Sequence, residues 1–255
     1  TPEVAAFLDE WFAPSDFVWG HPSGSTGTPK PVRLLKRDME ASARLTNDFF
    51  DITCRSVMLL CLSPDYIAGK MMIVRALLSG ADLLVVTPSS LPLTTIDEPI
   101  DFAAMVPAQV VESLKSTMQK SRLSRITSLI IGGAPLSPGT EVELEKLPVD
   151  MYATYGMTET VSHVALRRIG DSLSLYCALG GISFSIDERN CLIIHAPHFS
   201  VKEFVTNDVV ELVDSRNFRW IGRYDHVINT GGIKVFPELI EKKIAGLFTR
   251  RFFVT

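Results

Sequence analysis

Residues 23–30 carry the kinds of side chain that can hold a polyphosphate. They comprise four hydroxyl residues, two glycines, a proline and a lysine: Ser23, Gly24, Ser25, Thr26, Gly27, Thr28, Pro29 and Lys30. Glycines let main-chain N–H groups approach an anion, hydroxyls donate hydrogen bonds to phosphate oxygens, and lysine adds positive charge. The Gly-x4-Gly-Lys-Ser/Thr pattern of P-loop ATPases is absent, because Lys30 lies between two prolines instead of opening a helix. The segment predicts a nucleotide-binding loop, although a flexible linker can share this composition.

Four later segments carry further groups that suit a bound nucleotide. The first ends an apolar run with Gly132-Gly133-Ala134, where a flat ring can lie against the backbone. The second, residues 155–160, places an aromatic ring, a hydroxyl and a carboxylate at the end of an expected strand. The third ends at Asp208, and the fourth runs from Gly222-Arg223-Tyr224-Asp225 to Lys234. Each has a simpler explanation when taken alone, since glycine pairs mark turns and arginines form surface ion pairs.

The cysteines and histidines favour structural roles over a metal site. The four cysteines form no Cys-x-x-Cys pair and lie mostly in apolar stretches, which favours buried reduced thiols over disulfides. His195 and His198 have the spacing of metal ligands, but Pro197 between them disfavours a helix that would direct both rings to one ion. Loop or core histidines are therefore the favoured interpretation, and a metal pair is the alternative.

Composition places the chain among globular proteins with a sizeable core. It has 255 residues, of which 46% are hydrophobic and 21% charged. The formal net charge of -4 gives no reason to expect a nucleic-acid partner or an acidic membrane. Apolar runs such as residues 57–62 are far shorter than a bilayer span, and the first residues lack a signal-like block. We therefore expect cytoplasmic residence without membrane insertion, while the oligomeric state cannot be read from the sequence.

Strand and helix patterns alternate through the first 160 residues. We expect helices at residues 4–12, 37–50, 68–79, 107–118 and 138–147, and strands at residues 57–62, 82–87, 102–106, 127–131 and 151–154. This alternation predicts an α/β layered domain with a mainly parallel sheet.

A different pattern begins at about residue 161. Short strands separated by turn residues predict a mostly antiparallel β subdomain, with strands at residues 161–169, 173–177, 182–186, 192–195, 209–213 and 218–221. A strand through Ile228 and a helix from Pro237 follow, because proline just inside a helix and Glu238 in its first turn fit a helix start.

The five chemical segments, in this order, resemble the adenylate-forming (AMP-binding) superfamily. That family includes acyl-CoA synthetases, luciferases and the adenylation domains of peptide synthetases, and the resemblance covers residues 23 to about 245. It implies that a carboxylic acid joins ATP to give an acyl-adenylate and pyrophosphate, after which the acyl group passes to a thiol. ATP, Mg²⁺, coenzyme A and a small carboxylic acid are then the expected cofactors and partners of an acyl-CoA synthetase.

The resemblance implies roles for the matching residues. The β- and γ-phosphates would contact Ser23, Ser25, Thr26, Gly27, Thr28 and Lys30. The adenosine would contact Gly132, Gly133, Ala134, Tyr155, Gly156, Asp208 and Arg223, with Tyr155 stacked on adenine and the last two on the ribose. Thr158 would bond the α-phosphate or acyl oxygen, and Glu159 would hold Mg²⁺. Lys30, Thr158 and Glu159 are the candidate catalytic residues; a surface lysine and a solvated carboxylate are the simpler alternatives for Lys30 and Glu159.

Asp225 matches the family's hinge between a large amino-terminal domain and a small carboxy-terminal lid. We therefore expect an adenylation domain at residues 1–224, with the hinge and the start of the lid at residues 225–255. The family's lid is longer and supplies a late lysine that has no counterpart here. Either the chain is truncated, which an end in an incomplete strand favours, or adenylation is inefficient.

Within the family, the text from Asn229 to Pro237 and the residues after Glu159 are most similar to the o-succinylbenzoate-CoA ligases of menaquinone biosynthesis. Ser162 and His163 would then receive a second carboxylate or keto oxygen, although a histidine at a strand edge can also be hydrogen-bonded without a ligand role. Tyr66 would pack on an aromatic acid or fill the core. An aryl- or fatty-acid CoA ligase is the alternative among ligases. A nucleotide-binding module without turnover, and a phosphoryl transferase that releases ADP, are alternatives of other classes.

Overall fold

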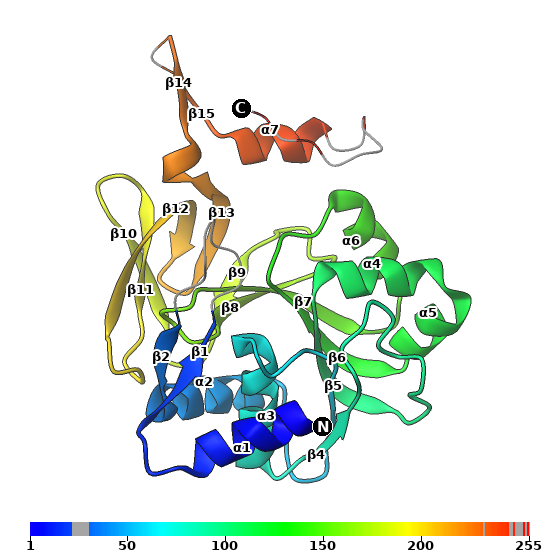
Figure 1. Cartoon of the computed structure of the whole chain (residues 1–255). Coiled ribbons are helices and arrows are strands. Elements are labelled where there is room, and N and C mark those ends of the chain that lie inside the picture. The colour runs from blue at the N-terminus through cyan, green and yellow to red at the C-terminus, as the bar shows by residue number, and fades with distance from the viewer. Residues whose placement is uncertain (22–30, 232, 245–246, 248–251, 253, 255) are drawn as a thin grey trace.

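A computed structural model of the chain describes residues 1–21, 31–231, 233–244, 247, 252 and 254. Its centre is a sheet of eleven strands in the order β10-β11-β12-β13-β9-β8-β7-β6-β5-β3-β4. Four short parallel pairings join one half of this sheet, and antiparallel pairings join the other half. Figure 1 shows both halves as one layer with helices packed around it.

The parallel half follows the alternation expected from the sequence. Its strands are β3 (Val57–Leu60), β4 (Asp82–Val85), β5 (Ile100–Met105), β6 (Ile126–Ile131) and β7 (Asp150–Gly156). Its helices are α3 (Ile67–Ser79), α4 (Pro107–Lys115), α5 (Thr117–Leu123) and α6 (Pro138–Leu144). The single helix expected at residues 107–118 is wrong, because Ser116 is extended and its side chain accepts a hydrogen bond from the Gln119 N–H to start α5.

The β-rich segment continues the same sheet instead of forming a separate one. Its strands are β8 (His163–Arg168), β9 (Tyr176–Ala178), β10 (Ser183–Ile186), β11 (Cys191–His195), β12 (Glu203–Asp214) and β13 (Asn217–Arg223). Strand β8 pairs antiparallel with β7, and this pairing joins the two halves. Strand β12 is longer than expected and includes Asp208.

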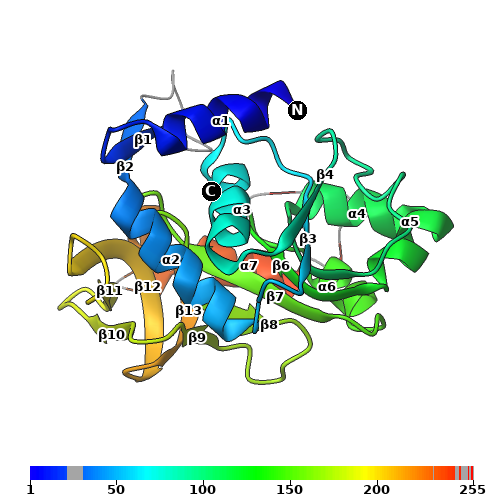
Figure 2. The same ribbon diagram turned by 90° about the horizontal axis from the view of Figure 1, so that it is seen from below.

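The two faces of the parallel strands bury different cores. In β5, Phe102 and Ala104 face the core that α1 (Pro2–Phe12), α2 (Lys36–Phe49) and α3 share, while Ala103 and Met105 face α4, α5 and α6. Figure 2 shows α2 and α3 beside each other against the sheet. The α/β layers expected from the sequence are therefore confirmed.

A hairpin of β1 (Phe17–Gly20) and β2 (Val32–Leu35), which the sequence analysis did not predict, flanks residues 22–30. Glu10 of α1 fixes its position, because one carboxylate oxygen accepts the Trp19 N–H at 2.7 Å and the other lies 3.2 Å from Lys70 Nζ of α3. The segment with the candidate phosphate-binding residues thus connects the two strands of a hairpin that Glu10 links to α1 and, through Lys70, to α3.

The chain after β13 projects beyond the sheet, toward the top of Figure 1. It forms a short 3-10 helix (Tyr224–His226), the hairpin β14 (Ile228–Thr230) and β15 (Ile233–Val235), and α7 (Pro237–Ile244), whose start at Pro237 confirms the expected helix. Within the described residues, no helix has both the length and the apolar character needed to cross a bilayer.

Candidate nucleotide and acyl site

The phosphate-loop residues lie outside the part of the chain that the structure describes. They are Ser23, Ser25, Thr26, Gly27, Thr28 and Lys30. Their roles therefore stay predictions of the sequence.

The glycines after β6 lie at the carboxyl end of the parallel strands, beside β7. A Cβ on Gly132 would lie 2.3 Å from Thr154 Oγ1, so a larger residue would require the Thr154 side chain to move, and Gly133 has a φ of 86°, which favours glycine. Ala134 follows and is exposed. This edge of a sheet is where open α/β folds bind ligands, and Gly133 is exposed there.

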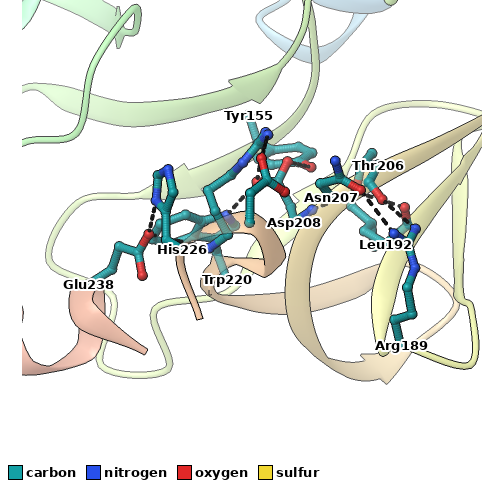
Figure 3. A network of polar contacts seen from close by, with 11 residues as sticks. Tyr155, Arg189, Leu192, Thr206, Asn207, Asp208, Trp220, His226 and Glu238 are labelled. Atoms are coloured by element: carbon teal, nitrogen blue, oxygen red, sulfur yellow. Dashed lines mark hydrogen bonds and ion pairs between the residues drawn. The ribbon is translucent and has the colours of Figure 1, made fainter. Parts of the chain in front are cut away.

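Asp208 of β12 is the centre of a polar cluster that draws on three strands (Figure 3). The Tyr155 hydroxyl of β7 donates to Asp208 Oδ2 at 2.7 Å, and the Trp220 Nε1–H of β13 donates to Oδ1 at 3.2 Å. Arg223 Nη1 lies 3.8 Å from Oδ1. Burial raises the pKa of Tyr155 well above its ordinary value, and the negative charge of Asp208 adds to this, so the phenol stays protonated and donates.

Arg223 connects this cluster to the expected hinge. Its Nη2 donates to Asp225 Oδ2 at 2.7 Å, and this hydrogen bond lowers the pKa of Asp225. Glu238 of α7 lies close by, since its Oε1 is 2.7 Å from His226 Nδ1 and accepts the Arg223 N–H at 3.4 Å. The ribose candidates and the first residues after β13 thus form one connected group, part of which Figure 3 shows.

The turn at residues 157–162 holds Thr158 and Glu159 between β7 and β8. Thr160 is buried and fixes the turn, because its hydroxyl accepts the Met157 N–H at 3.0 Å and lies 2.8 Å from the Ser162 carbonyl oxygen. Val161 has a φ of 63°, which is strained for a β-branched residue. Thr158 is half-buried and Glu159 is exposed, so neither side chain is enclosed in the core.

A second polar cluster lies beneath this turn, between α2, α3 and β8. Arg75 Nη2 donates to Ser162 Oγ at 2.9 Å, Ser162 Oγ lies 3.3 Å from His163 Nδ1, and His163 Nε2 lies 3.1 Å from Thr46 Oγ1. Thr46 donates in turn to the Ser42 carbonyl. One arrangement of hydrogens satisfies the whole series: Ser162 donates to Nδ1, and His163 donates from Nε2 to Thr46.

His163 is neutral in this cluster. Burial lowers the pKa of His163 well below its ordinary value, and the charge of Arg75 lowers it further. Both of its ring nitrogens have protein partners. His163 therefore orients the Ser162 hydroxyl, whose single hydrogen it accepts, and Arg75 is the group in this cluster with donors left for an anionic ligand.

Arg75 is the least expected member of the cluster. Only 1% of its surface is exposed, its Nε has no hydrogen-bond partner, and Nη1 contacts Met72 Sδ at 3.7 Å. Burial lowers the pKa of Arg75 to about 9, with no nearby carboxylate to oppose it within the described chain. A charged guanidinium is thus held out of water without a counter-ion.

Tyr66 lies apart from the other candidate pocket residues. It precedes α3, is 52% exposed and forms a parallel bridge with His21, whereas Arg75 is nine residues further along that helix. No hydrogen bond or ring contact between described residues joins Tyr66 to Ser162 or His163. The structure brings together Ser162 and His163, but not Tyr66.

Sequence reasoning missed two residues that the structure brings into the site, Arg75 and Trp220. The signal for Arg75 was available, since it is a lone arginine after Met71-Met72-Ile73-Val74 in an apolar helix. Trp220 gave no such signal, because the direction of its side chain depends on an irregularity in the strand pairing.

Among the described residues no group of three or more potential metal ligands occurs, so Glu159 remains a single candidate carboxylate for Mg²⁺.

Comparison with protein families places most of the chain in one of them. The family model for the AMP-binding enzyme matches residues 12–181. A probable 2-succinylbenzoate–CoA ligase of Mycobacterium tuberculosis is 26% identical over 239 residues, which cover 86% of this chain and 61% of that protein. A 2-succinylbenzoate–CoA ligase of Enterococcus faecalis is 28% identical over 153 residues, 59% of this chain and 32% of that protein. The chain spans less than two thirds of the length of these relatives.

Solved structures share the fold. An acyl-CoA synthetase (AMP-forming)/AMP-acid ligase II-like protein from Dyadobacter fermentans is 36% identical with a TM-score of 0.82, over 96% of this chain and 71% of that chain. The O-succinylbenzoate coenzyme A synthetase of Bacillus subtilis, in complex with ATP and magnesium ion, has a TM-score of 0.74. It is 18% identical over 91% of this chain and 54% of that chain, so this second similarity shows the fold alone.

Proposed function

The chain belongs to the AMP-binding enzyme family, and from this premise we propose that it activates a carboxylic acid with ATP and transfers the acyl group to coenzyme A. The first half-reaction joins a carboxylate oxygen to the α-phosphorus and releases pyrophosphate. The second replaces AMP with the thiol. The similarity to an AMP-forming synthetase at 36% identity supports this reaction class.

The buried Arg75 is the observation that carries the proposed substrate class. An isolated buried cation is unfavourable unless an anion or several acceptors surround it. Arg75 has the Ser162 hydroxyl, a weak contact to Met72 Sδ and an unpaired Nε. A substrate carboxylate would supply the missing charge through short charge-assisted hydrogen bonds.

We therefore propose that the acid has two carboxylates. One would accept hydrogen bonds from Arg75, beside Ser162, and the other would be activated beside the 157–162 turn. The aromatic keto acid o-succinylbenzoate has this chemistry, and the names of the curated relatives favour it. The ligation of o-succinylbenzoate to coenzyme A, a step of menaquinone biosynthesis, is the specific function proposed.

The adenosine candidates fit a nucleoside. Asp208 offers carboxylate oxygens that can accept two vicinal hydroxyls, and Arg223 lies beside it. Gly133 is exposed and would let adenine approach the backbone, with Tyr155 on the neighbouring strand. The proposed phosphate contacts are those of residues 23–30, by resemblance.

Glu159 and Thr158 fit Mg²⁺ by the chemistry of their donors, since a hard cation prefers carboxylate and hydroxyl oxygens. When bound, Mg²⁺ would neutralise charge on the triphosphate. Thr158 and Glu159 would orient the α-phosphate, and the strained turn that Thr160 fixes would hold both side chains at the end of β7.

An acid panel tests the proposal. Acid-dependent pyrophosphate release should be fastest with o-succinylbenzoate and slower with benzoate and octanoate, which lack a second carboxylate. Equal rates across the panel would exclude the dicarboxylate preference but leave a ligase. Nucleotide binding without pyrophosphate release would favour a binding module, and ADP as product a phosphoryl transferase. Cytoplasmic residence stays a prediction of the sequence.

A further inference from the structure

An irregularity in the β12–β13 pairing sets the direction of the Trp220 side chain. Asp208 pairs with Arg223 and Val209 with Gly222, but Val210 pairs with Trp220, so Ile221 is an extra residue on β13. In a regular ladder Val210 would face Ile221, and Trp220 would lie on the opposite face of the sheet from Asp208. The bulge moves Trp220 onto the face of Asp208, which is how bulges beside functional sites redirect side chains.

The redirected indole holds one of the two carboxylate oxygens of Asp208. Trp220 Nε1–H donates to Oδ1 at 3.2 Å, while the Tyr155 hydroxyl donates to Oδ2 at 2.7 Å. The backbone is fixed as well, because the Asp208 N–H donates to Thr206 Oγ1 at 3.0 Å. Both ends of the carboxylate are therefore held, and its plane cannot turn without breaking a hydrogen bond (Figure 3).

This arrangement leaves free capacity on both oxygens. A carboxylate oxygen can accept two hydrogen bonds, and each oxygen of Asp208 uses one for a neutral protein donor. Trp220 also packs against the core that α2 and α3 share, and indole has a single N–H donor and no acceptor. It can therefore hold Oδ1 in place without competing for a ligand's hydroxyl hydrogens.

We propose that Trp220 is a positioning residue that orients Asp208 toward two adjacent hydroxyls and so makes the site selective for ribonucleotides over deoxyribonucleotides. The proposal rests on the proposed function, because it takes Asp208 as the ribose ligand. Trp220 does not touch the nucleotide in this account. It acts by holding Oδ1, while Tyr155 holds Oδ2.

The experiment compares nucleotide affinities of the wild-type chain and Trp220→Phe by isothermal titration with ATP, 2′-deoxy-ATP and 3′-deoxy-ATP. Phenylalanine keeps an aromatic ring and removes the N–H. We expect the wild type to prefer ATP over both deoxynucleotides. In Trp220→Phe, ATP affinity should fall about tenfold, the deoxynucleotides should change less, and the preference should shrink accordingly.

Two further variants separate positioning from packing. Trp11→Phe makes the same chemical change in α1, where Trp11 contacts Phe7, and should leave all three affinities unchanged. Trp220→His keeps a ring N–H and should retain part of the ATP preference. It also serves as the test if Trp220→Phe does not fold, which thermal unfolding would reveal.

Equal weakening of all three nucleotides in Trp220→Phe would overturn the proposal, since that is the result of a packing defect. An unchanged preference would overturn it too. The titration contains no carboxylic acid, so its outcome does not depend on turnover. If Trp220→Phe loses the preference for ATP while the wild type releases no acid-dependent pyrophosphate, the role of Trp220 is supported and the ligase function is excluded. A wild-type chain that does not bind ATP would overturn both.

Discussion

Replacing Arg75 with methionine should make the unliganded protein more stable and the ligase less active toward a dicarboxylic acid. Burial alone lowers the pKa of Arg75 to about 9, more than three pH units below its ordinary value. At about 1.4 kcal/mol per pH unit, this decrease corresponds to roughly 5 kcal/mol of unfavourable solvation for the charged form. Because replacement of buried charges by apolar side chains typically recovers about 1–4 kcal/mol, we expect the free energy of unfolding to rise by about 2 kcal/mol.

The pH dependence has a definite sign. A base whose pKa is lowered in the folded state is penalised wherever it is charged, so the penalty is fully present below about pH 9. It is relieved only as the pH rises above about 9, where the unfolded chain binds more protons at this side chain than the folded one. The difference between Arg75→Met and wild type should therefore be constant from pH 6 to pH 8.

Urea denaturation followed by fluorescence measures the change in the free energy of unfolding. Arg122→Met is the matched control, because Arg122 has a full set of acceptors: the Leu93 carbonyl at 2.9 Å, the Thr94 carbonyl and the Asp97 carboxylate. Its loss should lower stability by about 1–3 kcal/mol. Substitution of arginine by methionine should thus raise stability at position 75 and lower it at position 122.

Acid-dependent pyrophosphate release measures the loss of activity toward a dicarboxylic acid. For Arg75→Met, kcat/KM with o-succinylbenzoate should fall about 100-fold, which is what the loss of a buried charge-assisted pair implies. Activity with benzoate and the affinity for ATP should change little, because no described contact of Arg75 reaches Asp208. A less stable variant that keeps the dicarboxylate preference would refute the reasoning, since Arg75 would then be an ordinary structural residue.

Three further substitutions test the nucleotide, metal and hinge assignments. Asp208→Asn should weaken ATP binding at least about tenfold in a titration, because it removes a charged acceptor from the ribose; unchanged affinity would exclude that role. Glu159→Gln should slow adenylate formation by about 100-fold and shift its Mg²⁺ dependence, yet leave the unfolding midpoint unchanged because the residue is exposed. Asp225→Pro should slow thioester formation more than adenylate formation, and equal losses in the two half-reactions would contradict a pivot.

Much of the parallel half was predictable because local signals are strong there. Gly80, with a φ of 71°, ends α3 where the sequence placed a helix end. Outside this half, Pro237 starts α7 as expected for the same reason. The break at Ser116 was missed because both flanking segments favour helix. The junction of β7 and β8 was missed for another reason: which strands pair depends on contacts between distant segments, and local patterns do not encode them.

Contiguous motifs in the sequence named three of the residues that the structure groups together, while their roles toward a nucleotide stay predictions. Asp208, Tyr155 and Arg223 occupy three separate motifs, and in the structure Tyr155 and Arg223 both lie beside the Asp208 carboxylate. Arg75 escaped notice because a charged residue in a helix is usually solvated, and only the three-dimensional structure reveals its burial. Trp220 escaped because a single extra residue reverses the face of a strand, which no alternation pattern anticipates.

The 157–162 turn connects the polar cluster at Asp208 with the polar cluster at Arg75. Tyr155, just before the turn, bonds Asp208, while Ser162, at its end, bonds Arg75. Gly156 permits this proximity, because a Cβ there would lie 2.4 Å from the Ser162 carbonyl oxygen. An acid held at Arg75 and a nucleotide held at Asp208 would therefore meet at the turn itself. A strained, hydrogen-bonded backbone is suited to that place, since joining acid to phosphate requires groups fixed in advance rather than groups that adjust.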